Sequence, residues 1–566
     1  MPRFTVPPNF TGTAGSDTLI GEDLNKFPAI GIDILTGGFI DTGLGKDTIK
    51  GIGTGGKGGD GAIGKNLNGS ESGAGIGISN NGNLNAGPCD DAIIGKGIGG
   101  RGGNGAEEAS GTAGGGGGAG TGISNIGILN TGLGNDTIIG NGTGSKGGGG
   151  DGGGGGAGTG ISNSGKLNAG DGNDTITGTG TGSNGESGYG GGRGATGTGI
   201  SNSGKLNAGD GNDTITGTGQ GGTGGGGRAS GNGGFGIGIS NTGQLDTGDG
   251  NDTITGIGIG GIAGNGLGPG DNGAGTGISN NGNLNTGDGN DTITGTGTGG
   301  EGGIGGTGTG ISNSKKLDTG DGEDTIIGTG TGTGGINSDG TGIQNMKGAT
   351  ITTGQGNDTI TGSGNGSAYN LIAYGISNDG VIDTGNGCDI LTGQATAKIG
   401  AIDDPLAYSD LMVIGISNDG VIDTGNGCDI LTGQATAKIG GTAYGIYGQG
   451  TIRTGDGNDK ITATSTINEV QQKVTIGGGI GIDLGTGNDY FKGFGTGTVD
   501  GGKGFDTLDL SAFNRSELTF SGVISGNALN PANISFNNNG DVITLSTTGF
   551  ENFIFADGSL CYSTLV

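Results

Sequence analysis

Isolated aliphatic residues recur along the chain at fixed distances from polar, glycine-rich turns. In residues 158–180 they are Ile161, Leu167 and Ile176, each with polar or glycine neighbours on both sides. Residues 197–219 repeat the same three anchors at the same offsets. Short alternations of this kind, separated by Gly, Asn and Asp turns, are typical of short β-strands. Each unit therefore predicts three strands that point one aliphatic side chain inward.

A second regularity is the turn before the third anchor, Gly-x-Gly-x-Asp, with an apolar side chain two residues later. From Asp174 to Asp291 its Asp recurs every 39 residues, three times in succession, and degenerate copies end in Asp17 and Asp91. Such a period is typical of a solenoid, whose stacked coils pair their backbones about 4.7–4.9 Å apart. We therefore expect an all-β fold, a right-handed parallel β-solenoid of glycine-rich coils. The thirteen full copies end in Asp47, Asp136, Asp174, Asp213, Asp252, Asp291, Asp324, Asp358, Asp389, Asp429, Asp459, Asp489 and Asp506.

Changes in composition divide the chain into three predicted regions. Residues 1–50 would form an N-terminal cap with the first degenerate repeats, and residues 51–500 the solenoid, whose glycine-rich spacers, such as 181–197, leave one edge of the coil. Beyond about residue 500, ordinary strand-like alternations with Phe and Leu replace the repeats. The last coil of a solenoid exposes its core and an open strand edge. We therefore expect residues 501–566 to form a small C-terminal β cap.

The overall composition limits the kind of core and the kind of partner. Glycine supplies 161 of 566 residues and hydrophobic residues only 28%, which is too few large side chains for a wide core. The formal net charge of −29 disfavours nucleic acid and anionic membrane surfaces as partners. No run approaches the ~18 consecutive apolar residues of a membrane span. Many of the acidic residues lie inside the repeated turn, which favours cations as ligands.

The repeated turn has the composition of a calcium site. Ca²⁺ takes about six to eight oxygen ligands, and mixes carboxylate with backbone carbonyl oxygens. Glycine permits the positive φ that brings carbonyls together, and the Asp supplies the carboxylate. Stacked carboxylates repel by about 1 kcal/mol per neighbour even in water, so a bound cation would also supply folding free energy. We predict the thirteen Asp residues as ligands. A further Asp at the variable third position would add negative potential or contact solvent, in Asp171, Asp210, Asp249, Asp288, Asp321 and Asp456.

These turns resemble the calcium-binding motif of the repeats-in-toxin (RTX, hemolysin-type) family, Gly-Gly-x-Gly-x-Asp-x-apolar-x. The resemblance implies a parallel β-roll in which carbonyls and Asp residues of successive turns sandwich Ca²⁺, with the thirteen Asp residues as ligands. The chain departs from the family in two respects. Family turns recur about every nine residues on both sides of the roll, whereas here most recur once per 30–45 residues, and their first Gly is usually Thr or Ala.

The residue types also bear on catalysis. The chain has no histidine, which excludes His-dependent serine and cysteine triads and zinc proteases with an HExxH motif. We therefore predict a calcium-binding repeat protein with a structural or adhesive role, and no enzyme. Two alternatives stay open. One is an ice-binding solenoid that uses outward Thr pairs such as Thr214 and Thr216, although Thr is also a common strand residue beside a buried Ile. The other is a polysaccharide lyase or epimerase of the β-helix type.

The two ends of the chain predict an extracellular location. Residues 1–17 lack the apolar region of a cleaved signal peptide. Residues 550–560 resemble the segment that closes many RTX regions ahead of an uncleaved C-terminal secretion signal. We therefore expect secretion by a type I-like route. Besides calcium, the expected partners are cell-surface polysaccharide or other surface proteins.

Overall fold

The structure is a computed structural model, and almost all of its regular structure is β. It describes residues 2–62, 68–106, 112–268, 270–302, 304–334, 338–367, 372–397, 411–438, 440–524 and 528–565. The chain divides into two compact units, which are residues 1–312 with 329–339, and residues 313–328 with 340–566. Strands β27 (Gly308–Asn313) and β29 (Thr325–Thr331) each contain one of the boundaries between the two units.

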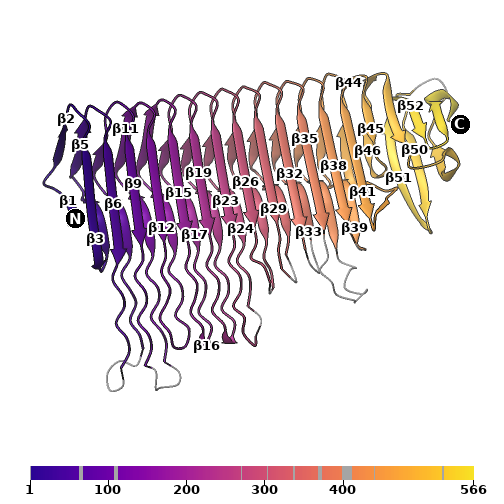
Figure 1. The fold of residues 1–566 in the computed structure, drawn as a ribbon. Coiled ribbons are helices and arrows are strands. Elements are labelled where there is room, and N and C mark those ends of the chain that lie inside the picture. The colour runs from indigo at the N-terminus through magenta and orange to yellow at the C-terminus, as the bar shows by residue number, and fades with distance from the viewer. Residues whose placement is uncertain are drawn as a thin grey trace. The chain divides into compact units, whose positions relative to one another are not determined.

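Each coil of unit 1 contributes three strands, and equivalent strands of successive coils pair in parallel (Figure 1). The first strands are β1 (Phe4–Val6), β4 (Ala29–Ile34), β7 (Gly75–Asn80), β10 (Gly120–Asn125), β13 (Gly158–Asn163), β17 (Gly197–Asn202), β21 (Gly236–Asn241) and β24 (Gly275–Asn280). The second are β2 (Phe10–Thr13), β5 (Phe39–Gly43), β8 (Asn83–Asn85), β11 (Ile128–Leu133), β14 (Lys166–Asp171), β18 (Lys205–Asn207), β22 (Gln244–Asp246) and β25 (Asn283–Asn285). The third are β3 (Thr18–Lys26), β6 (Thr48–Gly55), β9 (Ala92–Ile98), β12 (Thr137–Thr143), β15 (Thr175–Thr181), β19 (Thr214–Gln220), β23 (Thr253–Ile259) and β26 (Thr292–Thr298).

Unit 2 continues the same three-strand pattern, again with parallel pairing. Its first strands are β30 (Gly340–Asn345), β33 (Ile372–Asn378), β36 (Met412–Asn418) and β39 (Thr442–Tyr447). Its second strands are β28 (Lys316–Asp318), β31 (Thr350–Thr352), β34 (Val381–Asp383), β37 (Val421–Asp423) and β40 (Thr451–Arg453), and β43 (Ile476–Asp483) pairs with both kinds. Its third strands are β32 (Thr359–Gly366), β35 (Ile390–Ala397), β38 (Ile430–Ala437), β41 (Lys460–Ile467), β45 (Tyr490–Lys492) and β48 (Asp506–Leu510). The predicted parallel β-solenoid is thus confirmed.

The core of each coil is narrow, as its aliphatic content predicts. Ile161, Leu167 and Ile176 are fully buried, and so are their counterparts in the next coil. Because equivalent strands are in register, each anchor stacks on its counterpart, as Ile161 does on Ile200. The result is three continuous aliphatic files rather than a wide core.

Away from the turn, the two sheets of the solenoid meet at glycine residues. A Cβ added to Gly178 in β15 would lie 2.3 Å from the carbonyl oxygen of Gly199 in β17. At Gly180 it would lie 1.9 Å from the carbonyl oxygen of Thr198. Both distances are far below van der Waals contact, so backbone faces backbone here and only glycine fits.

A ladder of buried asparagines closes the bend between the first and second strands. The Asn125 side-chain amide donates to Oδ1 of Asn163 at 2.8 Å and to the carbonyl oxygen of Lys166 at 3.0 Å. Asn163 repeats both bonds in the next coil, to Asn202 at 2.8 Å and to the Lys205 carbonyl at 2.9 Å. These amides satisfy buried backbone groups that would otherwise lack partners, which fixes the bend.

The glycine-rich spacers of unit 1 form an ordered layer beyond the strand ends (Figure 1). In residues 181–197 every third backbone N–H donates to the spacer of the next coil at 2.8–3.0 Å, from Gly182, Gly185, Gly188, Gly191 and Gly194. A three-residue period is typical of the polyproline II conformation. The two legs of a spacer also pack on each other, since a Cβ on Gly185 would lie 2.0 Å from the Gly192 carbonyl oxygen. Two short strands, β16 (Gly188–Gly190) and β20 (Gly227–Ala229), pair within this layer.

The predicted C-terminal β cap closes unit 2, and its strands pair mostly antiparallel. Strand β51 (Asp541–Thr548) pairs in parallel with β46 (Gly495–Asp500) and antiparallel with β50 (Ala532–Asn538), which pairs with β49 (Leu518–Ser521). Strand β52 (Phe550–Phe555) follows β48 in the other sheet and pairs antiparallel with β53 (Gly558–Cys561). Both sheets therefore end in hairpins. The minor elements are β42 (Val470–Gln471), β44 (Thr486–Gly487), β47 (Lys503–Gly504), η2 (Arg515–Glu517) and η3 (Tyr562–Thr564). Within the described residues, no helix has the length and apolar character needed to cross a membrane.

Candidate metal centre

The repeated turn connects the second strand of a coil to the third and places its Asp just before the third strand. In the coil that contains β14 and β15, Gly170 and Gly172 have φ of 108° and 139°, and Asp174 follows. Gly209 and Gly211 repeat these angles at 112° and 136° in the next coil. Side chains other than glycine rarely adopt such φ values, which explains the fixed Gly-x-Gly spacing.

All thirteen predicted Asp residues lie in equivalent buried positions, and none has more than 2% of its surface exposed. In unit 1 the backbone N–H of each Asp donates to Oδ1 of the Asp one coil further on, at 2.6–2.7 Å, from Asp47 through to Asp252. In unit 2 the same chain of bonds runs from Asp324 to Asp506 at 2.8–2.9 Å. The structure thus brings the predicted residues together as one column within each unit.

The second carboxylate oxygen of most of these residues faces the interior without a hydrogen bond. Among the described residues, Oδ2 is buried and unpartnered in Asp47, Asp91, Asp136, Asp174, Asp213, Asp252, Asp459, Asp489 and Asp506. In three coils of unit 2 a threonine hydroxyl satisfies Oδ2 at 2.6 Å, as Thr384 does for Asp389. An unpaired buried carboxylate oxygen is costly, so the column needs either protons or cations.

Burial sets the protonation of the column. Loss of hydration raises the pKa of Asp213 to about 8 and that of Asp174 to about 7, despite the backbone N–H bond that each accepts. Neighbouring carboxylates raise both pKa values further. In Asp358 the Thr353 hydroxyl donates to Oδ2 and opposes desolvation, and the pKa rises only to about 6. Ala208 occupies the equivalent position in the coil of Asp213 and offers no hydroxyl.

The sequence prediction omitted members of these ladders. Asp91 was treated as a degenerate copy, yet it is 2% exposed, lies in the column and has an unpartnered Oδ2. Its apolar residue two positions later, Ile93, was the available signal. Asp17 begins the column in unit 1, because its N–H donates to Oδ1 of Asp47 at 2.6 Å. The asparagine ladder was also missed, although the repeated Ile-Ser-Asn indicated a fixed polar position.

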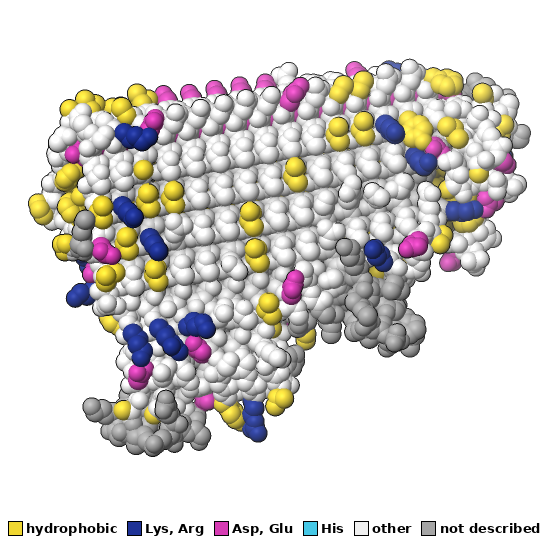
Figure 2. Space-filling model, in the orientation of Figure 1, with side chains coloured by type: hydrophobic (Ala, Val, Ile, Leu, Met, Phe, Trp, Pro, Cys, Tyr) yellow, Lys and Arg dark blue, Asp and Glu magenta, His cyan; other side chains and the backbone are white. Residues whose placement is uncertain are grey.

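The Asp residues at the third position of the turn point outward. Asp171, Asp210, Asp249 and Asp288 are exposed and stack one per coil in unit 1. Figure 2 shows regularly spaced acidic side chains along one edge of the molecule. These residues therefore contact solvent outside the buried column, which is one of the two roles that the sequence left open.

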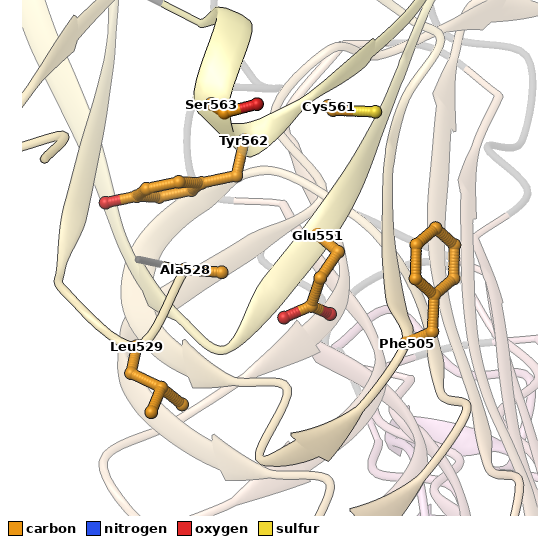
Figure 3. Close-up of a pocket in the computed structure, with 7 residues that line it drawn as sticks. All are labelled: Phe505, Ala528, Leu529, Glu551, Cys561, Tyr562 and Ser563. Carbon is orange, nitrogen blue, oxygen red and sulfur yellow. The ribbon is translucent and has the colours of Figure 1, made fainter. Parts of the chain in front are cut away.

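The column ends in the cap at Glu551. Its Oε2 accepts the Asp506 N–H at 2.8 Å, in the place of a further Asp. Figure 3 shows Glu551 beside a pocket that Phe505, Leu529 and Tyr562 also line. The cap thus ends the hydrogen-bond ladder of unit 2 with a longer carboxylate.

The donor set of the column fits a hard cation. Each coil offers one inward carboxylate, together with the backbone carbonyls of a turn whose glycines have positive φ. These are the oxygen ligands that Ca²⁺ prefers. The described residues contain no group of three or more His, Cys, Asp or Glu side chains suited to a metal. Calcium would accordingly take one or two column carboxylates per ion and complete its shell with carbonyls.

No protein-family model matches the sequence, and no curated protein matches it. A search of solved structures found an X-ray structure described as a hyperactive, Ca²⁺-dependent, β-helical antifreeze protein from an Antarctic bacterium. The match covers 97% of this chain and 94% of that one, at 15% identity and a TM-score of 0.26. This likeness is too weak to assign a function to the chain.

Proposed function

We propose that the protein is a secreted calcium-binding repeat protein with a structural or adhesive role, and that it completes its folding by binding Ca²⁺ along the Asp column. The observation that carries this proposal is the file of buried, unpartnered Oδ2 atoms. Calcium would supply positive charge to these carboxylates. The Gly-x-Gly turn positions them, and the backbone ladder through Oδ1 leaves Oδ2 available.

Substitution of the buried Asp is expected to remove calcium sites, whereas substitution of the exposed Asp is not. In Asp213→Asn the inward carboxylate is lost, so the number of bound ions should fall by about one or two. In Asp210→Asn, three residues away in the same turn, an exposed carboxylate is lost and the count should be unchanged. Equilibrium dialysis against ⁴⁵Ca²⁺ measures both. Equal loss in the two variants would contradict the inward site.

An extracellular location and a non-catalytic role belong to the same proposal. Extracellular calcium modules bind at about 10⁻⁴–10⁻³ M, which a cytosol low in calcium does not saturate. The chain would then fold once it reaches external calcium. The absence of histidine from the sequence supports the non-catalytic role.

A regular array of threonine side chains on the third strands favours ice binding as a second candidate function. On the outer face of the third strands, Thr175, Thr214, Thr253 and Thr292 lie in register, and a second file begins with Thr177 two residues on. Two further files, starting at Thr179 and Thr181, carry Thr, Ile or Gln. None of these sixteen side chains is charged. Figure 2 shows a broad face of the molecule with few charged side chains. The files repeat at the strand spacing of about 4.8 Å, which makes a regular array of hydroxyl and methyl groups.

The ice-binding candidate requires the protein to shape ice and to lose this activity when the array is broken. Thr214→Lys with Thr253→Lys places two charges in the first file and is expected to abolish thermal hysteresis. Ser201→Lys with Ser240→Lys is the matched control, because these residues also stack in register but on a first strand, in the other sheet. Absence of hysteresis from the unmodified protein, or equal loss in both double variants, would rule this function out.

A further inference from the structure

The spacer layer of unit 1 carries a hollow that the calcium column does not explain. Its volume is about 420 Å³, and its lining includes Arg193, Asn232, Phe235 and Asp271. The volume lies within the range of about 300–1,000 Å³ typical of small-molecule sites. Phe235, one of the lining residues, is 56% exposed.

Backbone hydrogen bonds fix the positions of these side chains. The carbonyls of Arg193, Asn232 and Asp271 each accept a bond from the preceding coil at 2.8–2.9 Å, so the three residues form one file across three coils. Three residues further on, Thr196 and Phe235 accept equivalent bonds and begin a second file. Because the spacers repeat every three residues, both files lie on the same face of the layer.

The polar groups at the hollow favour an uncharged ligand rich in hydroxyl groups. Among the described residues that line the hollow, Asp271 is the sole carboxylate and Arg193 the sole cation, so neither a metal ion nor an anion is selectively favoured. Asn232 and Asp271 hold each other through two bonds of 3.2 Å, which fixes their planes. Arg offers donors, Asp acceptors and Asn both, as paired hydroxyls require. The exposed ring of Phe235 supplies an apolar face beside them.

We propose that this hollow binds a neutral saccharide, with the Phe235 ring against the C–H face of one sugar ring and Arg193, Asn232 and Asp271 on its hydroxyls. A pocket with one aromatic wall and a few placed polar groups is the usual form of a small-ligand site. The inference deepens the proposed adhesive role by naming the class of partner. It does not depend on the Asp column, which lies at the turns and not in the spacers.

The test is affinity electrophoresis of the full chain in calcium buffer, through gels that contain dextran, mannan or galactan, with alginate as the uronate comparison. At least one neutral polymer should retard the protein. Phe235→Ala should weaken this binding at least about tenfold, and Asp271→Asn should weaken it as well. Tyr189→Ala is the matched control, because Tyr189 is a 64% exposed aromatic residue of the same layer but lies outside the hollow.

Three results would overturn the saccharide site: no retardation by any neutral polymer, retardation by alginate alone, or equal binding by Phe235→Ala and Tyr189→Ala. Circular dichroism and the calcium count of each variant are measured in parallel. If they are unchanged while sugar binding is lost, the saccharide site stands independently of calcium. If the calcium count of the unmodified chain is zero, the proposed calcium function fails while the sugar measurement remains valid.

Discussion

Removal of calcium at pH 8 is expected to abolish most of the β-sheet signal of the protein. At this pH most of the column carboxylates would have to ionise inside the fold, and at least nine of them have an Oδ2 without a partner. Each pKa unit corresponds to about 1.4 kcal/mol, and a domain is stable by only about 5–15 kcal/mol. The free-energy cost of several uncompensated buried carboxylates therefore exceeds the stability that the thin core can supply.

Circular dichroism and calorimetry during chelation with EGTA and readdition of calcium measure this effect. The β signal and the unfolding transition should disappear with EGTA and return cooperatively as free calcium rises. Magnesium is the control cation, because it dehydrates reluctantly and demands octahedral geometry, so it should restore much less. A chelated protein that keeps its full β signal and melting temperature would contradict the role of calcium in folding.

Without calcium, stability is expected to fall as the pH rises from about 4 to about 8. Burial raises the pKa of Asp174 to about 7 and that of Asp213 to about 8 in the folded state. The folded chain then binds more protons than the unfolded chain, whose Asp titrates near 3.9. The stability that these protonated groups contribute is fully present below the pKa of the unfolded state. It is lost as the pH rises through the pKa of the folded state. The chelated protein should therefore show a cooperative unfolding transition at pH 5 that is lost by pH 8.

Ala208→Thr tests the physical cause of this pH dependence. The equivalent Thr353 lowers the pKa of Asp358 through its hydroxyl, so a Thr at 208 should do the same for Asp213. The variant should lose less stability between pH 5 and pH 8 than the parent when both are chelated. With calcium bound the trend reverses, because protons then compete with the ion. An unchanged pH profile in Ala208→Thr, or a chelated protein most stable at pH 8, would contradict this account of the column.

Much of the fold could be predicted because its determinants are local and repeated. Ile161, Leu167 and Ile176 mark three strands by alternation alone, and the fixed period of the turns implies stacking. The Gly-x-Gly-x-Asp spacing located the buried Asp of thirteen coils, since positive φ at both glycines leaves few other turn geometries. The cap was predictable from its Phe-rich alternation.

The remaining features depend on contacts between coils, which a single unit does not encode. The three-residue hydrogen-bond period of residues 181–197 places glycine at every donor position from Gly182 to Gly194, but the partner of each donor lies in the next coil. The role of Asn163 likewise appears only when the next coil places Asn202 above it. Asp91 belongs to a degenerate copy, in which Cys89 replaces the second Gly of the motif, although the stacking of coils keeps its side chain in the column.

The most direct test of the calcium column is the anomalous diffraction of a crystal grown with calcium, with data collected at a long wavelength where calcium scatters anomalously. A file of anomalous peaks should run beside the inward carboxylates, one coil apart at about 4.8 Å or at alternate coils, within about 2.3–2.6 Å of Oδ2 atoms such as that of Asp213. Peaks found only beside exposed residues such as Asp210, or no peaks along the column, would contradict the calcium assignment.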